Sequence, residues 1–301
     1  MTKPILQGNQ FLANVKEYPK ENGHFNLWWL GQSGYLIQWN RANGNSIISR
    51  HLLIDPYLSN SLTKKYADTD KPHIRMTETV INPNQLDFID VATSSHNHTD
   101  HLDAETLIPL MSVNPKLKIV VPEANRDFAA DRLQVDAESL IGSDAGKSVT
   151  IADIEINGVP AAHETLEINA DGQHKFLGYV FQFGEWTIYH SGDTMLYGGM
   201  VTQFKRWEID LAILPINGSD PSRRVSGNLS GSQAVWLAQQ IGAKLVIPCH
   251  YEMFEFNTVS PDQFVAEAKK QGQNYCLLKC GERFSSKGNE FSNSRNDGGE
   301  N

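Results

Sequence analysis

The stretch of this 301-residue chain that decides the fold is His96-Asn97-His98-Thr99-Asp100-His101. Imidazole nitrogen and carboxylate oxygen are the atoms that divalent zinc, iron and manganese bind in proteins. In an extended segment His96 and His98 point to the same side, whereas Asp100 and His101 fall in the following turn and reach another point. This short loop therefore predicts a site for two adjacent metal ions. A polar surface turn is the alternative, and with ten histidines in the whole chain it is the weaker one.

Four more potential ligands lie where predicted strands end, namely Asp55, His163, Asp193 and His250. Each alone has an ordinary interpretation, because a histidine after a strand is more often a hydrogen-bonded rim residue and a Gly-Asp pair is more often a turn. Their recurrence at strand ends around a His-x-His-x-Asp-His loop favours one common site, since sites are built on loops that a scaffold positions. His190 is expected to be a structural neighbour of Asp193.

The order of the predicted elements indicates two packed sheets with helices outside, because strands come first and then alternate with helices. Strands are expected at residues 25–30, 35–39, 46–54, 116–121, 148–156, 176–183, 186–190, 209–215 and 244–248. Helices are expected at residues 103–111, 123–133, 232–241 and 260–271. The pair Asn157-Gly158 is expected to end the strand that begins at Ser148. The segment 57–86 is long and polar, which predicts either a functional loop or a small excursion over the site.

Residues 1–284 contain no internal repeat and no linker-like change of composition, so a single domain is expected there. The last residues, 285–301, are rich in Ser, Asn, Gly and charge, which predicts a disordered tail. No signal peptide, no membrane span and no disulfide framework is expected, because the start lacks an apolar core and the three cysteines are few. A cytoplasmic location follows as the default.

The net charge of −9, from 26 Lys and Arg against 35 Asp and Glu, argues against non-specific nucleic-acid binding, which needs basic surface. A small-molecule substrate is the expected partner, and a homo-oligomer is left open. Phosphate-binding candidates are Arg223 and Arg224 in a Gly-, Ser- and Pro-rich loop, since arginine suits bidentate phosphate contact. Lys71, His73 and Arg75 lie in the 57–86 segment, and a solvated surface charge is the better interpretation of Lys71.

Taken together, Asp55, the cluster 96–101, His163, Asp193 and His250 resemble the metallo-β-lactamase-fold superfamily of metal-dependent hydrolases. Within it, several pieces are similar to the L-ascorbate-6-phosphate lactonase family: Trp28-Trp29-Leu30-Gly31, Ile54-Asp55-Pro56, Tyr189-His190-Ser191-Gly192-Asp193 and Val246-Ile247-Pro248-Cys249-His250. The first piece with residues 95–103 is also similar to the phospholipase-D-type enzymes that hydrolyse N-acylphosphatidylethanolamine.

The resemblance implies an α/β (α+β) fold, a four-layer αββα sandwich of the metallo-β-lactamase type with the site at one edge of the sheets. It implies two divalent metal ions, which could be zinc, manganese or iron. One would be held by His96, His98 and His163, and the other by Asp100, His101 and His250. Asp193 would bridge both, and Asp55 would orient the ligands, as outer carboxylates commonly do.

The chemistry expected from such a site is hydrolysis of an ester-type bond by a metal-bridging hydroxide. The first substrate class is a lactone of a phosphorylated sugar or a similar small molecule, with Asp100 as the catalytic group that carries the proton. Two alternatives stay open: a phosphodiesterase acting on a lipid or nucleotide, and a non-catalytic member that only binds metal or ligand.

Overall fold

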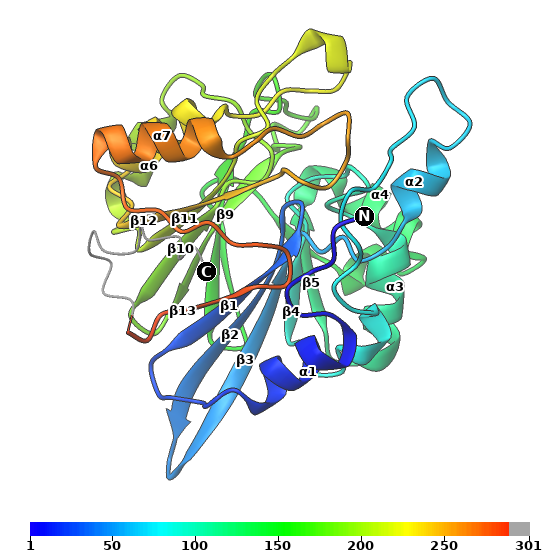
Figure 1. Ribbon diagram of the computed structural model, residues 1–301. Helices are drawn as coiled ribbons and strands as arrows, with labels where there is room; N and C mark the ends of the chain where they lie inside the picture. Colours follow the sequence, from blue (N-terminus) through cyan, green and yellow to red (C-terminus); the bar gives the residue numbers. More distant parts are fainter. Residues whose placement is uncertain (289–301) are drawn as a thin grey trace.

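Two mixed β-sheets form the inner layers of the computed structural model, which describes residues 1–288 (Figure 1). The first sheet has the order β13 (Arg283–Ser285), β1 (Phe25–Gly31), β2 (Gly34–Asn43), β3 (Ser46–Ile54), β4 (Val91–Thr93), β5 (Lys118–Pro122) and β6 (Ile141–Ser143). The second has the order β12 (Leu245–Cys249), β11 (Leu211–Pro215), β10 (Trp186–His190), β9 (Leu177–Phe183), β8 (Ile154–Pro160) and β7 (Ser148–Ile151).

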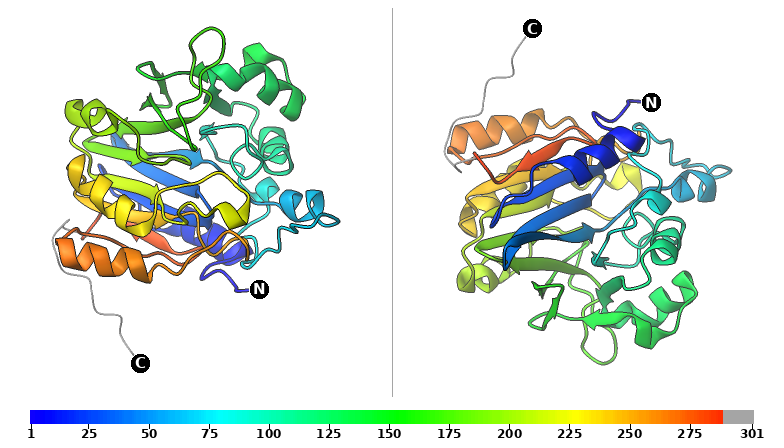
Figure 2. Two further views of the ribbon diagram at one scale, coloured as in Figure 1. Left: turned by 90° about the horizontal axis from the view of Figure 1, so that it is seen from above. Right: turned by 90° about the horizontal axis from the view of Figure 1, so that it is seen from below.

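Helices cover the outer faces of both sheets (Figures 1 and 2). On the second sheet α6 packs against β11, β12 and α7, whereas on the first sheet α4 packs against β5 and α3. The helix bounds are α1 (Gly8–Glu17), α2 (Ser61–Lys65), α3 (Ala104–Val113), α4 (Arg126–Leu133), α5 (Met200–Gln203), α6 (Gly231–Gln240) and α7 (Asp262–Gln271). The expected αββα sandwich is confirmed.

The core lies between the sheets and beneath the helices. All seven residues of β1 are buried, because one face of this strand meets the second sheet and the other meets α1. On the helix side the Phe11 ring of α1 packs edge-on against Trp28, and the Trp28 indole nitrogen donates to Asn14 Oδ1 at 2.9 Å. The parallel strands β11 and β12 are also buried throughout, as expected for strands covered on both faces.

Strand direction brings the candidate site together. In the first sheet β4 runs parallel to β3, and β1 runs in the same direction because β2 is antiparallel to both of its neighbours. In the second sheet β8, β10, β11 and β12 share one direction. The turns and loops after β3, β4, β8, β10 and β12 carry all of the ligand-type residues that the sequence analysis identified.

The expected end of the strand at Asn157-Gly158 is wrong. The chain turns at Ala152 and Asp153, whose φ angles of 49° and 64° suit a tight hairpin between β7 and β8. Gly158 lies within β8 opposite Tyr179, and a Cβ atom there would come within 2.3 Å of the Asp144 carbonyl oxygen. Close backbone packing, not a turn, therefore requires this glycine.

Two further differences concern the ends of the chain. Helix α1 was not expected from the sequence, and it closes the outer face of the first sheet. The proposed tail begins too early at residue 285, because Ser285 ends β13 and the buried Ser286 hydroxyl accepts a hydrogen bond from Phe25 N. Residues 289–301 lie outside the described part of the chain.

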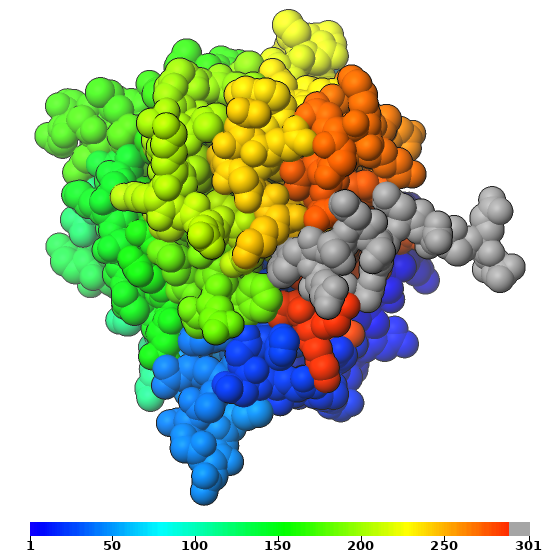
Figure 3. All heavy atoms as spheres, turned by 90° about the vertical axis from the view of Figure 1, so that its left-hand side faces the viewer, coloured from blue at the N-terminus to red at the C-terminus, as the bar shows by residue number. Residues whose placement is uncertain are grey.

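Two loops extend from the body of the sandwich. Figure 3 shows the hairpin tip between β2 and β3 projecting at one end and the loop near residues 217–228 at the other. The segment 57–86 carries α2 and the short 3₁₀ helix Pro83–Gln85. In the described residues the longest helices have ten residues, about half of what a bilayer crossing requires, and none qualifies as a membrane span.

Candidate metal centre

The histidine-rich loop leaves β4 and folds back on itself before α3. The Ser94 hydroxyl donates to the His96 carbonyl at 2.7 Å, and the His101 and Leu102 amides donate to the His98 carbonyl. These bonds bury His96 and His101 and leave His98 exposed at the cavity. The loop therefore presents two buried rings and one accessible ring.

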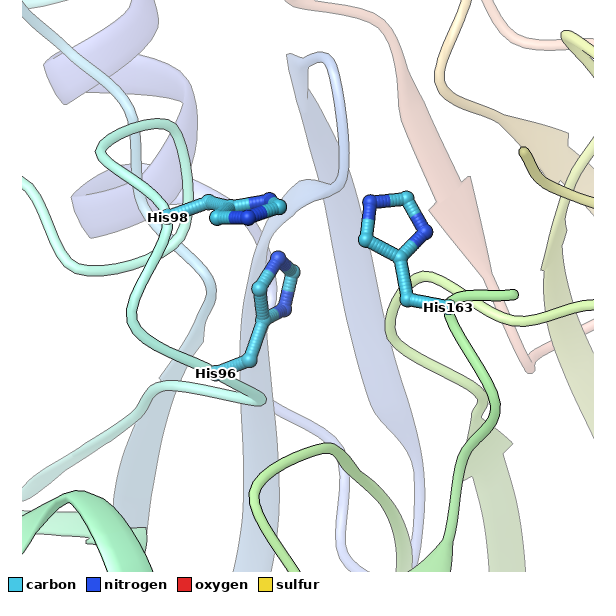
Figure 4. A group of neighbouring side chains, drawn as sticks. All are labelled: His96, His98 and His163. Atoms are coloured by element: carbon cyan, nitrogen blue, oxygen red, sulfur yellow. The ribbon is translucent and has the colours of Figure 1, made fainter. Parts of the chain in front are cut away.

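His96, His98 and His163 form the first group of converging side chains (Figure 4). The ring centroid of His163 lies 5.5 Å from that of His96 and 5.1 Å from that of His98. His163 follows β8, and its Nδ1 faces the Gly227 carbonyl oxygen at 2.9 Å. Because a carbonyl only accepts, Nδ1 carries the proton, and the Nε2 lone pair faces the other rings.

Asp100, His101 and His250 form a second group, with ligand-type atoms that all lie within 4.8 Å of one another. The carboxylate of Asp193 lies between the two groups. One of its oxygens is 3.1 Å from His250 Nε2 and 3.5 Å from His163 Nε2, and the other is 3.4 Å from His101 Nε2. Asp193 thus faces both groups at once.

Asp55 and Ser95 fix the orientation of the buried rings. Asp55 is fully buried at the end of β3, where it accepts hydrogen bonds from the Ser95 amide and hydroxyl. It also accepts from His101 Nδ1 at 2.7 Å, and the Ser95 hydroxyl lies 3.0 Å from His96 Nδ1. Both histidines therefore point Nε2 into the site, which is the arrangement that carboxylate partners impose on metal-binding histidines.

Gln32 belongs to the site although the sequence indicated only that it lies between the strands expected at residues 25–30 and 35–39. Its Nε2 donates to Asp100 Oδ2 at 2.7 Å and lies 3.0 Å from His250 Nε2, and its backbone carbonyl accepts from the His250 amide. Gln32, Asp55 and His250 also have φ angles of 51°, 41° and 62°, a region that L-residues other than glycine rarely adopt. Such strain clusters at functional sites, where surrounding structure holds it in place.

His190 is the structural neighbour that the sequence suggested. Its Nε2 donates to the Ser33 carbonyl at 3.0 Å, and its Nδ1 accepts from the Gly192 amide. The Gly192 turn leads directly into Asp193 at a φ of 58°, and a Cβ atom on it would lie 2.6 Å from the Ser95 side chain. The packing of this turn against Ser95 sets where the Asp193 carboxylate lies.

The donor set fits divalent metal ions. Among residues 1–288, the buried atoms His96 Nε2, His101 Nε2 and Asp193 Oδ1 converge within 4.8 Å and form no hydrogen bond. Leaving several buried polar atoms unsatisfied is costly, and native structures leave few of them without a partner of some kind. Nitrogen and carboxylate oxygen donors on rings that are already oriented match zinc, manganese or iron.

The electrostatics of His96 support the same interpretation, whereas at His101 and His250 the carboxylates of Asp193 and Asp100 outweigh burial and raise the pKa. Burial lowers the pKa of His96 well below its usual range, so this ring is neutral, which is the form that binds metal. Burial alone would raise the pKa of Asp193, but the rings of His250 and His101 hold it well below its usual range. Burial would likewise raise the pKa of Asp100, and His101 and His250 lower it. Both carboxylates are therefore ionised at neutral pH.

A cavity of about 430 Å³ opens above the site. Its floor includes His98, Asp100 and Asp193, and its walls come from the segment 57–86, the loop 217–228, α4 and the chain after His250.

Arg224 lines the cavity and forms an ion pair with Asp70 at 2.7 Å. Arg223 is not among the lining residues, and its guanidinium donates to the Asn217 carbonyl. Arg75 is buried, donates to the Thr77 and Ser59 carbonyls and serves the loop rather than the cavity.

Comparison with known proteins identifies the chain by family. The family model "Beta-lactamase superfamily domain" matches residues 50–251. A metal-dependent hydrolase of Hyperthermus butylicus is 26% identical over 262 residues, covering 85% of this chain and 97% of that protein. The protein named "Probable L-ascorbate-6-phosphate lactonase UlaG" of Escherichia coli O127:H6 is 24% identical over 294 residues, covering 89% of this chain and 81% of that protein.

Solved structures agree on the architecture. The isothiocyanate hydrolase from Delia radicum gut bacteria superimposes with a TM-score of 0.63 at 17% identity, covering 86% of this chain and 98% of that one. At this identity the similarity shows the fold alone.

Proposed function

This chain belongs to the metallo-β-lactamase superfamily of metal-dependent hydrolases, and from that premise we propose that it cleaves an ester-type bond, first of all a lactone, in a small anionic molecule. The observation that carries the proposal is the convergence of His96 Nε2, His101 Nε2 and Asp193 Oδ1, which are buried and form no hydrogen bond among the described residues. The relative in Escherichia coli that is named a lactonase supports the substrate class.

In this proposal His96, His98 and His163 would hold one divalent ion, and Asp100, His101 and His250 would hold a second. Asp193 faces both groups, so its carboxylate would be available to each position. Two such ions, when bound, lower the pKa of a water molecule towards neutrality and polarise the oxygen that gains charge during attack. The surrounding residues transfer the proton, orient the ligands and contact the substrate.

Asp100 is the residue that carries the proton. Its carboxylate lines the cavity, is ionised at neutral pH and accepts a hydrogen bond from Gln32 Nε2. An ionised carboxylate beside the attacking water accepts its proton and returns it to the leaving oxygen of the ester. Gln32 holds the acceptor oxygen in place, and Asp55 and Ser95 keep the rings of His101 and His96 oriented.

Arg224 is the substrate contact in this proposal. It lines the cavity, whereas the Arg223 side chain is directed to Asn217 and Asp220. A phosphate or carboxylate on the substrate would compete with Asp70 for the Arg224 guanidinium, because exposed ion pairs contribute little. Phosphodiesters are the second candidate substrate class, since Lys65 and Arg224 both line the same cavity and would neutralise a phosphate.

The experiment that tests the function combines metal content with turnover. Elemental mass spectrometry of the purified protein should find about two equivalents of zinc, manganese or iron. His98→Ala should lose at least one equivalent and should lower turnover by more than the ~100-fold that the loss of an outer partner costs. His24→Ala is the matched control, because His24 lies away from the site and contacts the Ser286 hydroxyl.

Turnover of δ-valerolactone and of bis(p-nitrophenyl) phosphate separates the two substrate classes. Preferential cleavage of the lactone supports the first proposal, and preferential cleavage of the diester supports the second. Full turnover in His98→Ala and Asp193→Ala would overturn the assigned site. Metal binding without turnover of either compound would favour the non-catalytic alternative.

A further inference from the structure

One wall of the cavity is built from aromatic rings that the proposed chemistry does not use. Tyr66, His73, Phe254 and Phe256 all line the cavity, and they are called the aromatic wall below. Tyr66 stacks on His73 with ring centroids 4.1 Å apart, and the ring planes of Phe254 and Phe256 stand at 71° and 67° to that of His73. Two segments far apart in sequence thus contribute to one ordered surface.

His73 is held firmly within this wall. The Thr63 hydroxyl donates to its backbone carbonyl at 2.7 Å, and its Nδ1 faces the Lys71 carbonyl oxygen at 3.2 Å. Nδ1 therefore carries the proton, which leaves Nε2 as a hydrogen-bond acceptor. Burial lowers the pKa of His73, so the ring stays neutral at pH 7.

Two cations, Lys65 and Arg224, line the same cavity, and a third, Lys71, lies behind the aromatic wall with its Nζ enclosed. Lys65 Nζ is 5.2 Å from the Tyr66 ring centroid, and Lys71 Nζ is 4.9 Å from that of Phe256. Arg224 lines the cavity and is paired with Asp70. Within residues 1–288, Lys71 Nζ has no hydrogen-bond partner, so it adds positive charge behind the wall without lining the cavity.

Rings and cations together define a ligand chemistry. Aromatic side chains bind a planar apolar group through offset or edge-to-face contacts, and a few polar groups then fix its orientation. Cations beside the rings attract a negative charge at the outer end of such a group.

We propose that the aromatic wall, with Lys65 and Arg224, is a subsite for a planar aromatic or heteroaromatic part of the substrate that carries a negative charge. The inference rests on the proposed function, because it names the group attached next to the scissile ester. The planar ring of the substrate would lie against His73 and Phe256, and the anionic end of the substrate would lie beside the cations. Aromatic esters and aryl lactones with an acidic substituent are the resulting substrate class.

A binding experiment tests the subsite without any turnover. Naphthalene-2-sulfonate is the probe and cyclohexanesulfonate is its non-aromatic counterpart, with binding to the metal-loaded protein measured by calorimetry. The naphthalene compound should bind more tightly, and Phe256→Leu should weaken it about fivefold, within the range that aromatic contacts contribute. Phe88→Leu is the matched control, because Phe88 is equally half-buried but packs under His51, away from the cavity.

Charge is tested with two adjacent lysines of α2. Lys65→Gln should weaken binding about threefold, and added salt should reduce the difference. Lys64→Gln should leave binding unchanged, because Lys64 is paired with Glu105 and does not line the cavity. Equal binding of the two sulfonates, or equal effects within each pair of variants, would overturn the subsite.

Turnover then separates failure of the subsite from failure of the proposed function. Phe256→Leu should lower kcat/KM for the aryl lactone dihydrocoumarin about fivefold relative to that for δ-valerolactone. If neither lactone is cleaved but the sulfonate result holds, the subsite stands and the reaction class is wrong. If both are cleaved with the same ratio in wild type and variant, the reaction stands and the subsite is wrong.

Discussion

Asp55 binds three groups at once, and this makes it the residue on which the orientation of the site depends. It accepts hydrogen bonds from the Ser95 amide, the Ser95 hydroxyl and His101 Nδ1. Asp55→Asn keeps the shape but weakens the contact that fixes the His101 ring. We expect metal affinity to fall about 10–100-fold.

Competition with a chelator measures this loss of affinity. Asp87→Asn provides the control, since Asp87 forms an exposed ion pair with Lys16. An unchanged affinity in Asp55→Asn would mean that packing alone orients the ring.

Gln32 is expected to act mainly on one half of the site. Its amide contacts Asp100 and His250, whereas the group formed by His96, His98 and His163 lies beyond it. Gln32→Ala removes a hydrogen bond to an ionised carboxylate, a contact that contributes about 1.5–3 kcal/mol. The second metal equivalent should therefore bind at least about tenfold more weakly, while the first keeps its affinity.

Stepwise metal titration followed by calorimetry resolves the two equivalents. Gln85→Ala, which changes a glutamine bonded to Asn9 far from the site, is the comparison. A parallel loss of both equivalents would show that Gln32 supports the fold and not the second position.

The sequence predicted the acidic and imidazole members of the site because their residue types carry metal chemistry and recur at strand ends. Gln32 carried no such signal, since an amide between two glycines is typical of a turn. Arg223 and Arg224 were equivalent in sequence, whereas in the structure Arg223 ends a 3₁₀ helix and Arg224 adopts a left-handed conformation.

At the scale of single elements, β3 contains a pH-sensitive contact remote from the site. His51 accepts a hydrogen bond from Gln38 Nε2 at 3.1 Å and packs against the Phe88 ring. Burial, aided by the charges of Lys20 and Arg50, lowers the pKa of His51 from 6.5 to about 3. The neutral ring is therefore the folded form, and the unfolded chain binds one more proton between these two pH values.

The contribution of His51 to the free energy of unfolding should consequently be constant well above pH 6.5. It should fall as the pH drops through this value. Between pH 7 and pH 5 the loss from His51 is about 2 kcal/mol. His51→Gln keeps an acceptor for Gln38 and removes the proton site. Urea unfolding at both pH values should show a smaller pH dependence in this variant, and identical slopes would contradict the assignment.

Elements were predicted well where periodicity and burial agreed. They were predicted poorly where a glycine could serve either a turn or close backbone packing. The hairpin turn at residues 184–185 was expected and found, because Gly184 adopts a positive φ there. Gly158 has the same chemistry but serves close packing against Asp144, and the true turn at Ala152 and Asp153 contains no glycine. Local composition does not distinguish these uses, because the neighbouring strand decides between them.

At the scale of the whole molecule, the proposed ions connect loops of both sheets. His96 to His101 follow a strand of the first sheet, and His163, Asp193 and His250 follow strands of the second. Metal binding should therefore stabilise the fold as well as support the reaction. Removal by chelator should lower Tm by about 5–10 °C when the metal had been present at some hundredfold above its Kd.

Differential scanning calorimetry measures this shift. Restoring the metal should restore Tm in the wild type and in His24→Ala, and Asp193→Ala should respond to neither treatment. A wild-type Tm that does not change when chelator is added would show that the two sheets pack together without the ions.

The pairing of β13 with β1 has a consequence for how the chain is made. Asn26, Leu27 and Trp28 leave the ribosome early, but their partners Ser285, Phe284 and Arg283 are among the last described residues to follow. Until then the first strand exposes one edge of unpaired backbone groups, which is a template for pairing with another chain. A ribosome that stalls between His250 and Arg283 would release a chain that has every ligand residue but remains open to aggregation along β1.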